Sequence, residues 1–363
     1  MPSSPSLASR RRTATAALRT GAARIAAIVA TPLVPEDYLD LLTPLKSGSD
    51  LRGRIVAVEP ETPDAATIVI KPGRGWRQHV PGQYLRIGVD IDGVRQWRAY
   101  SLTSPLHRRD GCVTITVKAI PDGVVSNHLV HRAAVGTVVQ LDQACGEFTL
   151  AAQTSPKTLF VTAGSGITPV MAILRNATLP DTVVVHSAPT ASDVIFSAEL
   201  RALAAAGRIT LIERHTAIDG MLEVTELATL VPDLTERETW ACGPTGLLDA
   251  VEAHCADVGV VVHTERFRPS VLATGEGGTV TFSRAGTVVQ ADGSTPLLVA
   301  GEAAGVLMPS GCRMGICFGC VVPLREGAVR DLRSGDLTTA APGDGVLIQT
   351  CVSAAAGACD IDV

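Results

Sequence analysis

The chain has 363 residues, of which 46% are hydrophobic and 3% aromatic, with a mean hydropathy of +0.27. This length predicts two or three domains, and this composition excludes disorder over most of the chain. The 31 basic and 36 acidic residues give a formal charge of −5, which leaves no overall basic field for binding nucleic acid.

The first 48 residues are expected to form an extension ahead of the folded domains. The basic run Arg10–Arg12 precedes an Ala-rich stretch, but no uninterrupted apolar core or cleavage site follows, which disfavours an export signal. The longest apolar stretch near the start of the chain, Ile25–Val34, falls far short of the roughly 20 residues that span a bilayer. We therefore expect a cytoplasmic protein, and the basic N-terminal segment leaves weak peripheral contact with the inner face of the membrane open.

Short β-type runs separated by turn residues follow between about Leu51 and Leu150. The expected strands are Arg54–Val58, Thr67–Ile70, Gln83–Val89, Trp97–Leu102, Val113–Ala119 and Thr137–Leu141. Short strands at this spacing predict an antiparallel barrel or sandwich.

The next part of the chain alternates between strands and helices. The expected strands are Thr158–Thr162, Thr182–His186, Ile209–Glu213 and Thr239–Cys242, and the expected helices are Val170–Asn176, Val194–Ala204 and Gly246–Cys255. Such alternation predicts a parallel sheet with helices on both faces.

The first strand of this second unit runs into a glycine turn, Gly164-Ser-Gly-Ile-Thr-Pro169. Thr168 is placed to cap a helix and Pro169 to occupy its first position. A helix N-terminus reached over small residues is a place where a pyrophosphate binds. The segment lacks the G-x-G-x-x-G pattern, so by itself it indicates a dinucleotide site only weakly.

A third and smaller unit closes the chain. The glycine-rich stretch Gly275–Gly278 is expected to be a flexible joint, and the strands Thr279–Phe282 and Thr287–Gln290 predict a hairpin beyond it. The expected divisions are an extension over 1–48, domains over 49–152 and 153–268, a linker over 269–278 and a domain over 279–363.

The nine cysteines are placed unevenly. Their odd number and their clustering argue against a secreted disulfide framework. The spacing Cys-x4-Cys-x2-Cys with a distant fourth cysteine is the ligand pattern of plant-type [2Fe–2S] ferredoxins, whereas four-cysteine zinc sites usually pair two short knuckles. We expect the cluster ligands to be Cys312, Cys317, Cys320 and Cys351. No role is assigned to Cys112, Cys145, Cys255 and Cys359.

Residues from about Thr279 onward resemble a plant-type ferredoxin domain. From about Leu51 onward the chain resembles the ferredoxin–NADP⁺ reductase superfamily, in its class with a C-terminal ferredoxin domain. The motifs that carry this resemblance are Arg98-Ala-Tyr-Ser101, Gly123-Val-Val-Ser126, Gly164-Ser-Gly-Ile-Thr-Pro169 and Ala241-Cys-Gly-Pro244. The resemblance implies a multidomain fold: an antiparallel β-barrel FAD domain, an α/β parallel-sheet nucleotide domain and an α+β ferredoxin domain of the β-grasp type.

The resemblance implies an FAD site on the barrel. Arg98 would pair with the FAD pyrophosphate, Tyr100 would lie against the flavin ring, and Ser101 would lie near flavin N5. Gly123 and Ser126 would add donors to the same diphosphate. The chemistry suits these residue types, because a guanidinium fork matches a diphosphate and an aromatic face matches an isoalloxazine.

The resemblance also implies a pyridine nucleotide site on the second domain. Gly164, Gly166 and Thr168 would hold the pyrophosphate, while Cys242 and Gly243 would border the nicotinamide.

At the end of the nucleotide domain, the resemblance implies that Glu265 helps to organise the nicotinamide site, so Ser101, Cys242 and Glu265 are the expected catalytic residues. Phe267 either covers the flavin or packs in the core of a domain joint. Arg214 is a candidate contact to the nucleotide, but Met221 stands where relatives often have arginine, which leaves NADH or NADPH open.

The implied activity is that of an NAD(P)H:acceptor oxidoreductase, with electrons passing from NAD(P)H to FAD, to the [2Fe–2S] cluster and to a redox protein. Thr31–Tyr38 resembles the reductases of lipid desaturases, so a di-iron fatty-acid desaturase or alkane or lipid hydroxylase is the first expectation for the acceptor. The alternatives are a ring-hydroxylating oxygenase or cytochrome P450 as acceptor, and a zinc- or nucleotide-binding regulatory protein without electron transfer. We expect a monomer that binds no nucleic acid.

Overall fold

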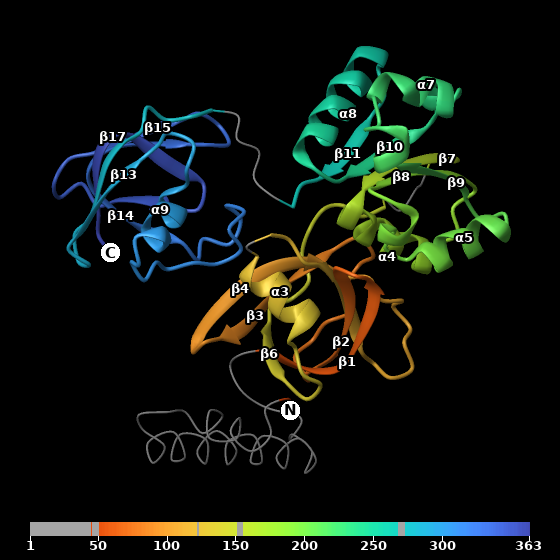
Figure 1. Ribbon diagram of the computed structural model, residues 1–363, viewed down its shortest axis with the longest axis horizontal. Helices are drawn as coiled ribbons and strands as arrows, with labels where there is room; N and C mark the ends of the chain where they lie inside the picture. The colour runs from red at the N-terminus through yellow and green to blue at the C-terminus, as the bar shows by residue number, and fades with distance from the viewer. Residues whose placement is uncertain (1–44, 46–50, 122, 151–154, 268–272) are drawn as a thin grey trace, which may run out of the picture.

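The computed structural model describes residues 45, 51–121, 123–150, 155–267 and 273–363, which fold as three units in chain order (Figure 1). Most of the expected N-terminal extension, with its proposed membrane contact, lies outside these residues. Within the described ranges, no helix is both long enough and apolar enough to cross a membrane. The predicted combination of an antiparallel barrel, a parallel α/β domain and a small α+β domain is confirmed.

The first unit is a six-stranded antiparallel sheet in the order β4-β3-β6-β1-β2-β5. A bridge between Leu102, just after β4, and Ile115, in β5, joins the two ends of this order and closes the barrel. Alternate residues of β3 (Leu85, Ile87 and Val89) are buried in the interior, as expected for a strand with one face on the core. The elements are β1 (Arg52–Thr62), β2 (Ala65–Pro72), β3 (Tyr84–Ile91), β4 (Val94–Ser101), β5 (Val113–Lys118), α3 (Val124–His131) and β6 (Val138–Leu141).

The second unit is a five-stranded sheet in the order β11-β10-β7-β8-β9, in which the paired strands are parallel. One apolar core lies with α4 and α5 and another with α7 and α8, so helices cover both faces as predicted. The strands are β7 (Lys157–Ala163), β8 (Asp181–Ala188), β9 (Thr210–His215), β10 (Glu238–Cys242) and β11 (Val262–Glu265). The helices are η1 (Gly164–Gly166), α4 (Ile167–Asn176), η2 (Ala191–Asp193), α5 (Ser197–Ala205), α6 (Thr216–Asp219), η3 (Val224–Glu226), α7 (Leu227–Leu230), η4 (Leu234–Glu236) and α8 (Thr245–Val258).

The strand order of this sheet reverses beside β7, because β8 and β9 lie on one side of it and β10 and β11 on the other. Ligands of open α/β sheets bind at the carboxyl ends of the strands where the order reverses. The ends of β7 and β10 therefore mark the place for a nucleotide, and both glycine motifs of this domain lie there.

The third unit is a mixed sheet in the order β13-β12-β17-β14-β15, with β16 also paired to β14. β12 and β17 are parallel, and the other pairs are antiparallel. Its core gathers Phe282, Leu297, Leu324 and Ile361 between the sheet and α9. The elements are β12 (Gly278–Phe282), β13 (Thr287–Ala291), α9 (Leu297–Ala303), β14 (Val321–Asp331), β15 (Leu337–Ala340), β16 (Val346–Gln349) and β17 (Ser353–Ile361).

The expectation of a flexible joint at Gly275–Gly278 is wrong. The N–H of Gly275 donates to the carbonyl of Gly293 at 2.6 Å, and the N–H of Gly277 donates to the carbonyl of Ala355 at 3.0 Å. These backbone hydrogen bonds tie the stretch to the third unit. Glycines have no side chain, which allows Gly275 and Gly278 to approach the carbonyls of Ala355 and Gly357 closely. Residues 268–272, the rest of the expected joint, lie outside the described residues.

Candidate functional site

The last residues of β4 and β11 bring two polar side chains from different domains together. Ser101 Oγ lies 3.5 Å from Glu265 Oε2, and Ser101 is buried. Burial raises the pKa of Glu265 to about 8, against the opposing effect of the Ser101 hydroxyl. A buried carboxyl group with a raised pKa at the junction of the barrel and the parallel-sheet domain is a candidate for a functional group.

Cys242 lies beside this pair at the end of β10. It is opposite Glu265 in β11 and Thr162 in β7, and it has no exposed surface. Burial raises the pKa of its thiol well above the ordinary value, and the nearby Glu265 carboxylate acts in the same direction. Cys242 is therefore a neutral thiol, which suits a small wall of a binding site and not a nucleophile.

The loop after β7 packs directly on the end of β10. A Cβ on Gly166 would collide with the carbonyl oxygen of Cys242, so a side chain at this position would push the two loops apart. Gly164 has a φ of +54°, a left-handed conformation that favours glycine. These two glycines thus shape the loop at the place where the strand order reverses.

The predicted position of Thr168 as the helix cap is wrong. Helix α4 begins at Ile167, its N-cap residue is Gly166, and the Thr168 hydroxyl donates to the carbonyl of Ser165 at 2.9 Å. The buried hydroxyl is already used in the first turn of the helix, because the 3₁₀ turn before α4 starts the helix earlier than Pro169 suggested.

Arg98 is a half-buried cation on β4. Its guanidinium donates to the carbonyl of Trp97 at 2.7 Å. Among the described residues no carboxylate lies within ion-pair distance of it, although Glu302 acts on its charge from farther away. Burial and the nearby charge of Arg313 lower the pKa of Arg98 to about 10. A shielded guanidinium without a carboxylate partner fits the diphosphate of FAD, which would supply the missing negative charge.

Tyr100, Gly123 and Ser126 surround this part of the barrel. Tyr100 packs against the barrel core, and burial raises the pKa of its hydroxyl. Gly123 is the N-cap of α3, whose first N–H groups form the kind of helix terminus that binds phosphate. The Ser126 hydroxyl donates to the carbonyl of Gly123 at 3.1 Å, so it supports the turn at this helix terminus.

Two further predicted residues are engaged within the nucleotide domain. Phe267 packs against the core that contains α4 and α5. The Arg214 guanidinium donates to the carbonyls of Asp219, Gly220 and Met221 at 2.7, 3.1 and 3.2 Å, and it pairs with Glu226 at 3.2 Å. Direct contact between Arg214 and a nucleotide phosphate would require it to give up one of these partners.

The four predicted cluster cysteines converge on one loop region as two contacting pairs. The side chains of Cys312 and Cys317 form one pair, and those of Cys320 and Cys351 form the other. The N–H of Cys312 donates to the sulfur of Cys317 at 3.0 Å, and the N–H of Met314 donates to that of Cys312 at 3.4 Å. Two pairs of thiols with backbone donors fit a cluster of two irons, each held by two cysteines.

An arginine that the motifs did not single out supports this loop. Arg333 donates to the carbonyl of Gly315 at 3.0 Å and pairs with Asp331 at 2.7 Å, and Gln349 donates to the same Gly315 carbonyl at 3.1 Å. Sequence reasoning missed Arg333 because it lies 13 residues after the last cysteine of the loop, in a segment of balanced charge.

The cysteines without a predicted role have different surroundings. Cys255 and Cys359 are buried in apolar cores, and burial raises the pKa of both thiols. Cys112 is buried beside Asp110. Cys145 is exposed and forms a β-bridge with Tyr84 at the start of β3.

The barrel and the nucleotide domain are joined by both apolar packing and hydrogen bonds. Phe148, at the end of the barrel segment, packs edge-on against Trp240 of β10 with ring centroids 5.0 Å apart. From α4, Arg175 donates to the carbonyl of Thr103 at 2.6 Å, and Asn176 accepts from the N–H of Leu106 at 2.7 Å. Neither α4 residue belongs to a motif, so the sequence offered no sign of this contact.

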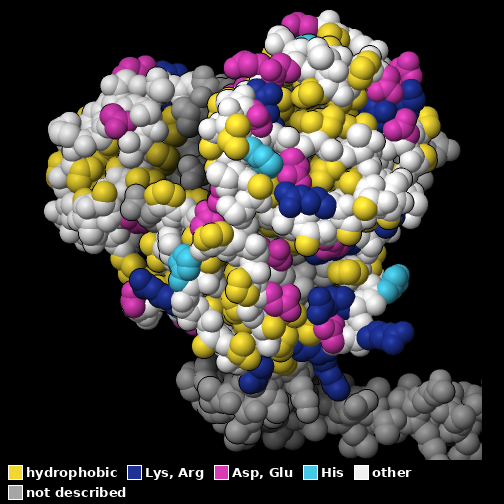
Figure 2. Space-filling view, turned by 45° about the vertical axis from the view of Figure 1, so that its right-hand side comes forward, with side chains coloured by type: hydrophobic (Ala, Val, Ile, Leu, Met, Phe, Trp, Pro, Cys, Tyr) yellow, Lys and Arg dark blue, Asp and Glu magenta, His cyan; other side chains and the backbone are white. Residues whose placement is uncertain are grey.

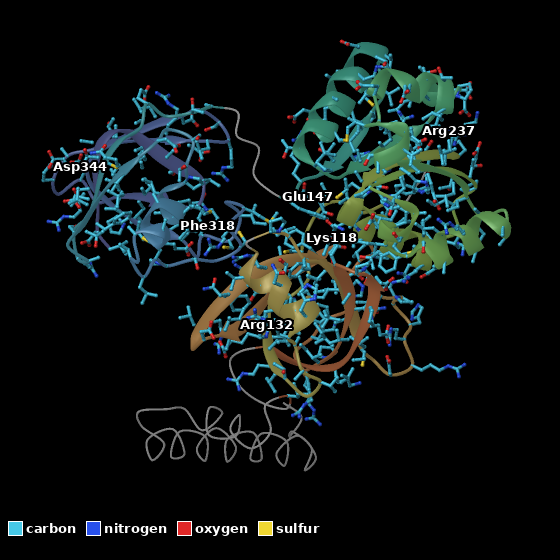
Figure 3. The ribbon with its side chains drawn as sticks, in the orientation of Figure 1. Lys118, Arg132, Glu147, Arg237, Phe318 and Asp344 are labelled. Carbon is cyan, nitrogen blue, oxygen red and sulfur yellow. The ribbon has the colours of Figure 1, made fainter. Side chains whose placement is uncertain are left out.

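The ferredoxin-like unit meets the barrel through its cysteine loop. Arg86 of β3 forms a hydrogen bond with the side chain of Cys317. Figure 3 shows Phe318, the next residue, on the side of this unit that faces the barrel. On the molecular face of Figure 2, basic and acidic side chains are interleaved and form no continuous surface of one sign.

Comparison with protein-family models gives two matches. Residues 74–150 match the oxidoreductase FAD-binding domain, and residues 280–356 match the 2Fe-2S iron-sulfur cluster binding domain.

Two curated relatives and one solved structure are similar over most of the chain. An NADPH oxidoreductase of Mycobacterium tuberculosis is 50% identical, covering 94% of this chain and 91% of that protein. The ferredoxin reductase component of 3-ketosteroid-9-alpha-monooxygenase from M. tuberculosis is 30% identical, covering 76% and 85%. The structure of phthalate dioxygenase reductase superposes with a TM-score of 0.59 at 21% identity, covering 87% and 98%, which shows a shared fold.

Proposed function

Since the chain belongs to the ferredoxin–NADP⁺ reductase superfamily of flavoproteins that carry a C-terminal plant-type [2Fe–2S] domain, we propose that it supplies electrons from NADPH to an oxygen-activating iron enzyme. FAD and the cluster, when bound, supply the conversion of a two-electron hydride into single electrons. The protein's own residues bind and orient these groups and exclude water from them.

The observation that carries this proposal is that both junctions meet on adjacent strands of the barrel. The hydride side lies at the end of β4, where Ser101 approaches Glu265. The cluster side lies along β3, where Arg86 contacts Cys317. Since β3 and β4 are paired, with Tyr84 directly opposite Ser101, a flavin on this edge would lie between the nucleotide and the cluster.

We assign the following roles to the residues at the hydride side. Ser101 and Glu265 orient the nicotinamide and the flavin edge, and the Glu265 carboxylate favours the positive charge that develops on the nicotinamide ring. Cys242 forms the neutral wall of the same site. Arg98 binds the FAD diphosphate together with the N-terminus of α3, which begins after Gly123.

The cosubstrate proposal rests on the relative that is 50% identical, which is named an NADPH oxidoreductase. Arg214 stabilises the loop over residues 219–221 next to the expected position of the nucleotide, since its donors are used by that loop. The preference is tested by comparing kcat/KM for NADPH and NADH with ferricyanide as acceptor, and a higher value for NADH would overturn it.

For the acceptor, we propose a di-iron fatty-acid desaturase or lipid hydroxylase. The support is the resemblance of Thr31–Tyr38 to desaturase-partner reductases, in a segment outside the described residues. A ring-hydroxylating oxygenase or a cytochrome P450 is the second candidate, because the relative that is 30% identical is named as the reductase component of a monooxygenase.

Reconstitution separates these acceptors. The holoprotein and NADPH are combined with a membrane desaturase, a ring-hydroxylating oxygenase or a cytochrome P450 from the same organism, and product formation is measured. We expect turnover with the desaturase, and its absence together with turnover by another acceptor would overturn the desaturase proposal. Deletion of residues 1–24 is expected to reduce co-sedimentation with membranes, and unchanged co-sedimentation would exclude membrane docking by this segment.

A further inference from the structure

Arg86 lies on β3 of the barrel and contacts the neighbouring domain. Its guanidinium forms a hydrogen bond with the side chain of Cys317, the second cysteine of the cluster loop. Because a guanidinium carries only donors, the sulfur is the acceptor of this hydrogen bond. Arg86 belongs to none of the flavin, nucleotide or cysteine motifs, so its contact with a cluster ligand comes from the packing of two domains.

Two contacts, with Asp142 and Trp97, hold the Arg86 side chain in place. Its guanidinium pairs with Asp142, whose backbone N–H donates to the carbonyl of Arg86 at 2.9 Å. The guanidinium carbon lies 5.7 Å from the ring centroid of Trp97 on β4. The Trp97 ring lies flat on Gly88, directly opposite in β3, where a Cβ would be only 2.9 Å from the ring. The arginine is thus oriented before the cluster loop meets it.

On the other side of the contact, Cys317 receives several donors. The N–H groups of Cys312 and Gly319 donate to its sulfur at 3.0 and 3.4 Å. The positive charge of Arg86 acts on the same side chain from the barrel. Arg86 therefore adds a formal positive charge to neutral backbone donors that belong to the loop itself.

The chemical consequence follows from the charge of the cluster. Reduction adds one negative charge, and a hydrogen bond from a cation to a ligating sulfur stabilises the more negative form. Hydrogen-bond partners of metal ligands tune the site, and losing one typically costs about 10–100-fold in metal affinity or activity. The same hydrogen bond holds the loop against the barrel, on the strand next to the one that bears the predicted flavin contacts.

We propose that Arg86 is a positioning residue for electron transfer, which raises the reduction potential of the cluster and holds the cluster loop on the FAD barrel. The inference rests on the proposed path of electrons from FAD to the cluster. It adds Arg86, a residue of the FAD barrel, to the groups that act on the cluster of the ferredoxin domain. It assigns to the FAD domain a direct influence on the electron affinity of the ferredoxin domain.

The test measures the cluster in the full-length holoprotein. Arg86→Gln removes the charge, and Arg86→Met also removes the donors but keeps an apolar stem against Trp97. In a potentiometric titration followed by EPR, we expect both variants to shift the one-electron reduction equilibrium about tenfold toward the oxidised cluster, which is 59 mV for n = 1. Hydrogen–deuterium exchange over residues 312–320 is expected to rise in both variants.

Two further variants separate this role from general damage to the barrel. Arg86→Lys keeps the positive charge, so its potential should return toward that of the wild type. Arg95→Gln is the matched control, because Arg95 lies in the same β3–β4 pair and contacts Asp90 at 2.8 Å. We expect Arg95→Gln to leave the potential and the exchange of the loop unchanged.

A wild-type potential in either Arg86→Gln or Arg86→Met would overturn the proposal, as would an equal shift in Arg95→Gln. If Arg86→Gln fails to fold, the cluster potential of Arg86→Met tests the proposal in its place. The potential and the exchange are measured without NADPH or an acceptor protein. A failure to support turnover of any acceptor would therefore contradict the proposed function and leave the assignment of Arg86 standing.

Discussion

The two domains that flank the FAD barrel contact it in different ways. The nucleotide domain shares an apolar core with the barrel through Phe148 and Trp240 and adds hydrogen bonds from Arg175 and Asn176. The ferredoxin domain contacts the barrel through the cluster loop, where a charged side chain meets a cysteine. The junction with the nucleotide domain is packed like the interior of a domain, and the junction with the ferredoxin domain is polar.

This difference matches what the proposed function would transfer at each junction. A hydride moves with its nucleus, so the reacting atoms must be held about 3–3.5 Å apart in a fixed orientation. A single electron has no such requirement for atomic contact. A packed junction therefore suits the nicotinamide side, while a polar contact is sufficient on the cluster side.

The largest expected effect comes from breaking the cluster side alone. In Cys317→Ser, reduction of cytochrome c through the cluster should fall by at least about 100-fold, since even outer-shell partners of metal ligands are worth 10–100-fold. NADPH–ferricyanide activity should stay within about twofold, because the packed junction is untouched. Both activities are measured on one preparation, with cytochrome c and with ferricyanide as acceptor. An equal loss of both would contradict separate flavin and cluster stages of electron transfer.

The reverse experiment breaks the hydride side alone. Glu265→Gln should lower NADPH–ferricyanide activity by roughly 10²-fold, the cost of removing one preorganised electrostatic group. The cluster's EPR signal and potential should not change. A variant whose cluster potential shifted as well would show that the two junctions are coupled.

The pH dependence sharpens the same prediction. With the pKa of Glu265 raised to about 8, its carboxylate forms as the pH rises through 8, so the rate of hydride transfer should increase over that range. The same group should make the folded protein less stable as the pH rises from its unfolded pKa toward 8, because the folded state holds the proton more tightly. Glu265→Gln should remove both slopes, and a slope that persisted would assign the titration to another group.

A smaller effect is expected from the glycine loop on the hydride side. Gly166→Ala forces a methyl group against the carbonyl of Cys242, so the loops must separate at a cost of about 1–3 kcal/mol. Gly164→Ala is the control, because a Cβ there meets nothing within 4 Å and only the positive φ is penalised, by about 1 kcal/mol. Urea unfolding of the full chain followed by tryptophan fluorescence compares the two variants. Equal midpoints would mean that the close approach of Gly166 to Cys242 is not needed for stability.

The smallest effect is expected where the packed junction loses a hydrogen bond and keeps its apolar core. Asn176→Ala leaves the N–H of Leu106 and the carbonyl of Ser104 without this partner, at a cost of about 1 kcal/mol. The rate of hydride transfer should fall by less than it does in Glu265→Gln. Cytochrome c reduction should fall by the same factor as hydride transfer. A loss as large as that of Glu265→Gln would show that hydrogen bonds, and not the shared core, hold this junction.

Much of the fold could be predicted because its signals are local. The short β-type runs between 51 and 150 and the alternation of strands with helices between 157 and 265 depend on neighbours in the sequence, and the antiparallel and parallel sheets predicted from them are confirmed. The errors also have local causes. Thr168 is a good capping residue in isolation, yet the 3₁₀ turn before it starts the helix earlier. Gly275 and Gly277 form hydrogen bonds with Gly293 and Ala355, which are 18 and 78 positions away.

The candidate site divides in the same way. The sequence by itself determined the four cysteines, the glycine turn and the Arg98-to-Ser101 segment, because ligand spacing and turn chemistry are properties of short stretches of chain. Only the tertiary structure brought Ser101 to Glu265, 164 positions away, and Arg86 to Cys317, because a contact between domains depends on how separate surfaces pack. Burial at those contacts, which the order of residues does not encode locally, sets the charge of Glu265 and places a cation beside the cluster loop.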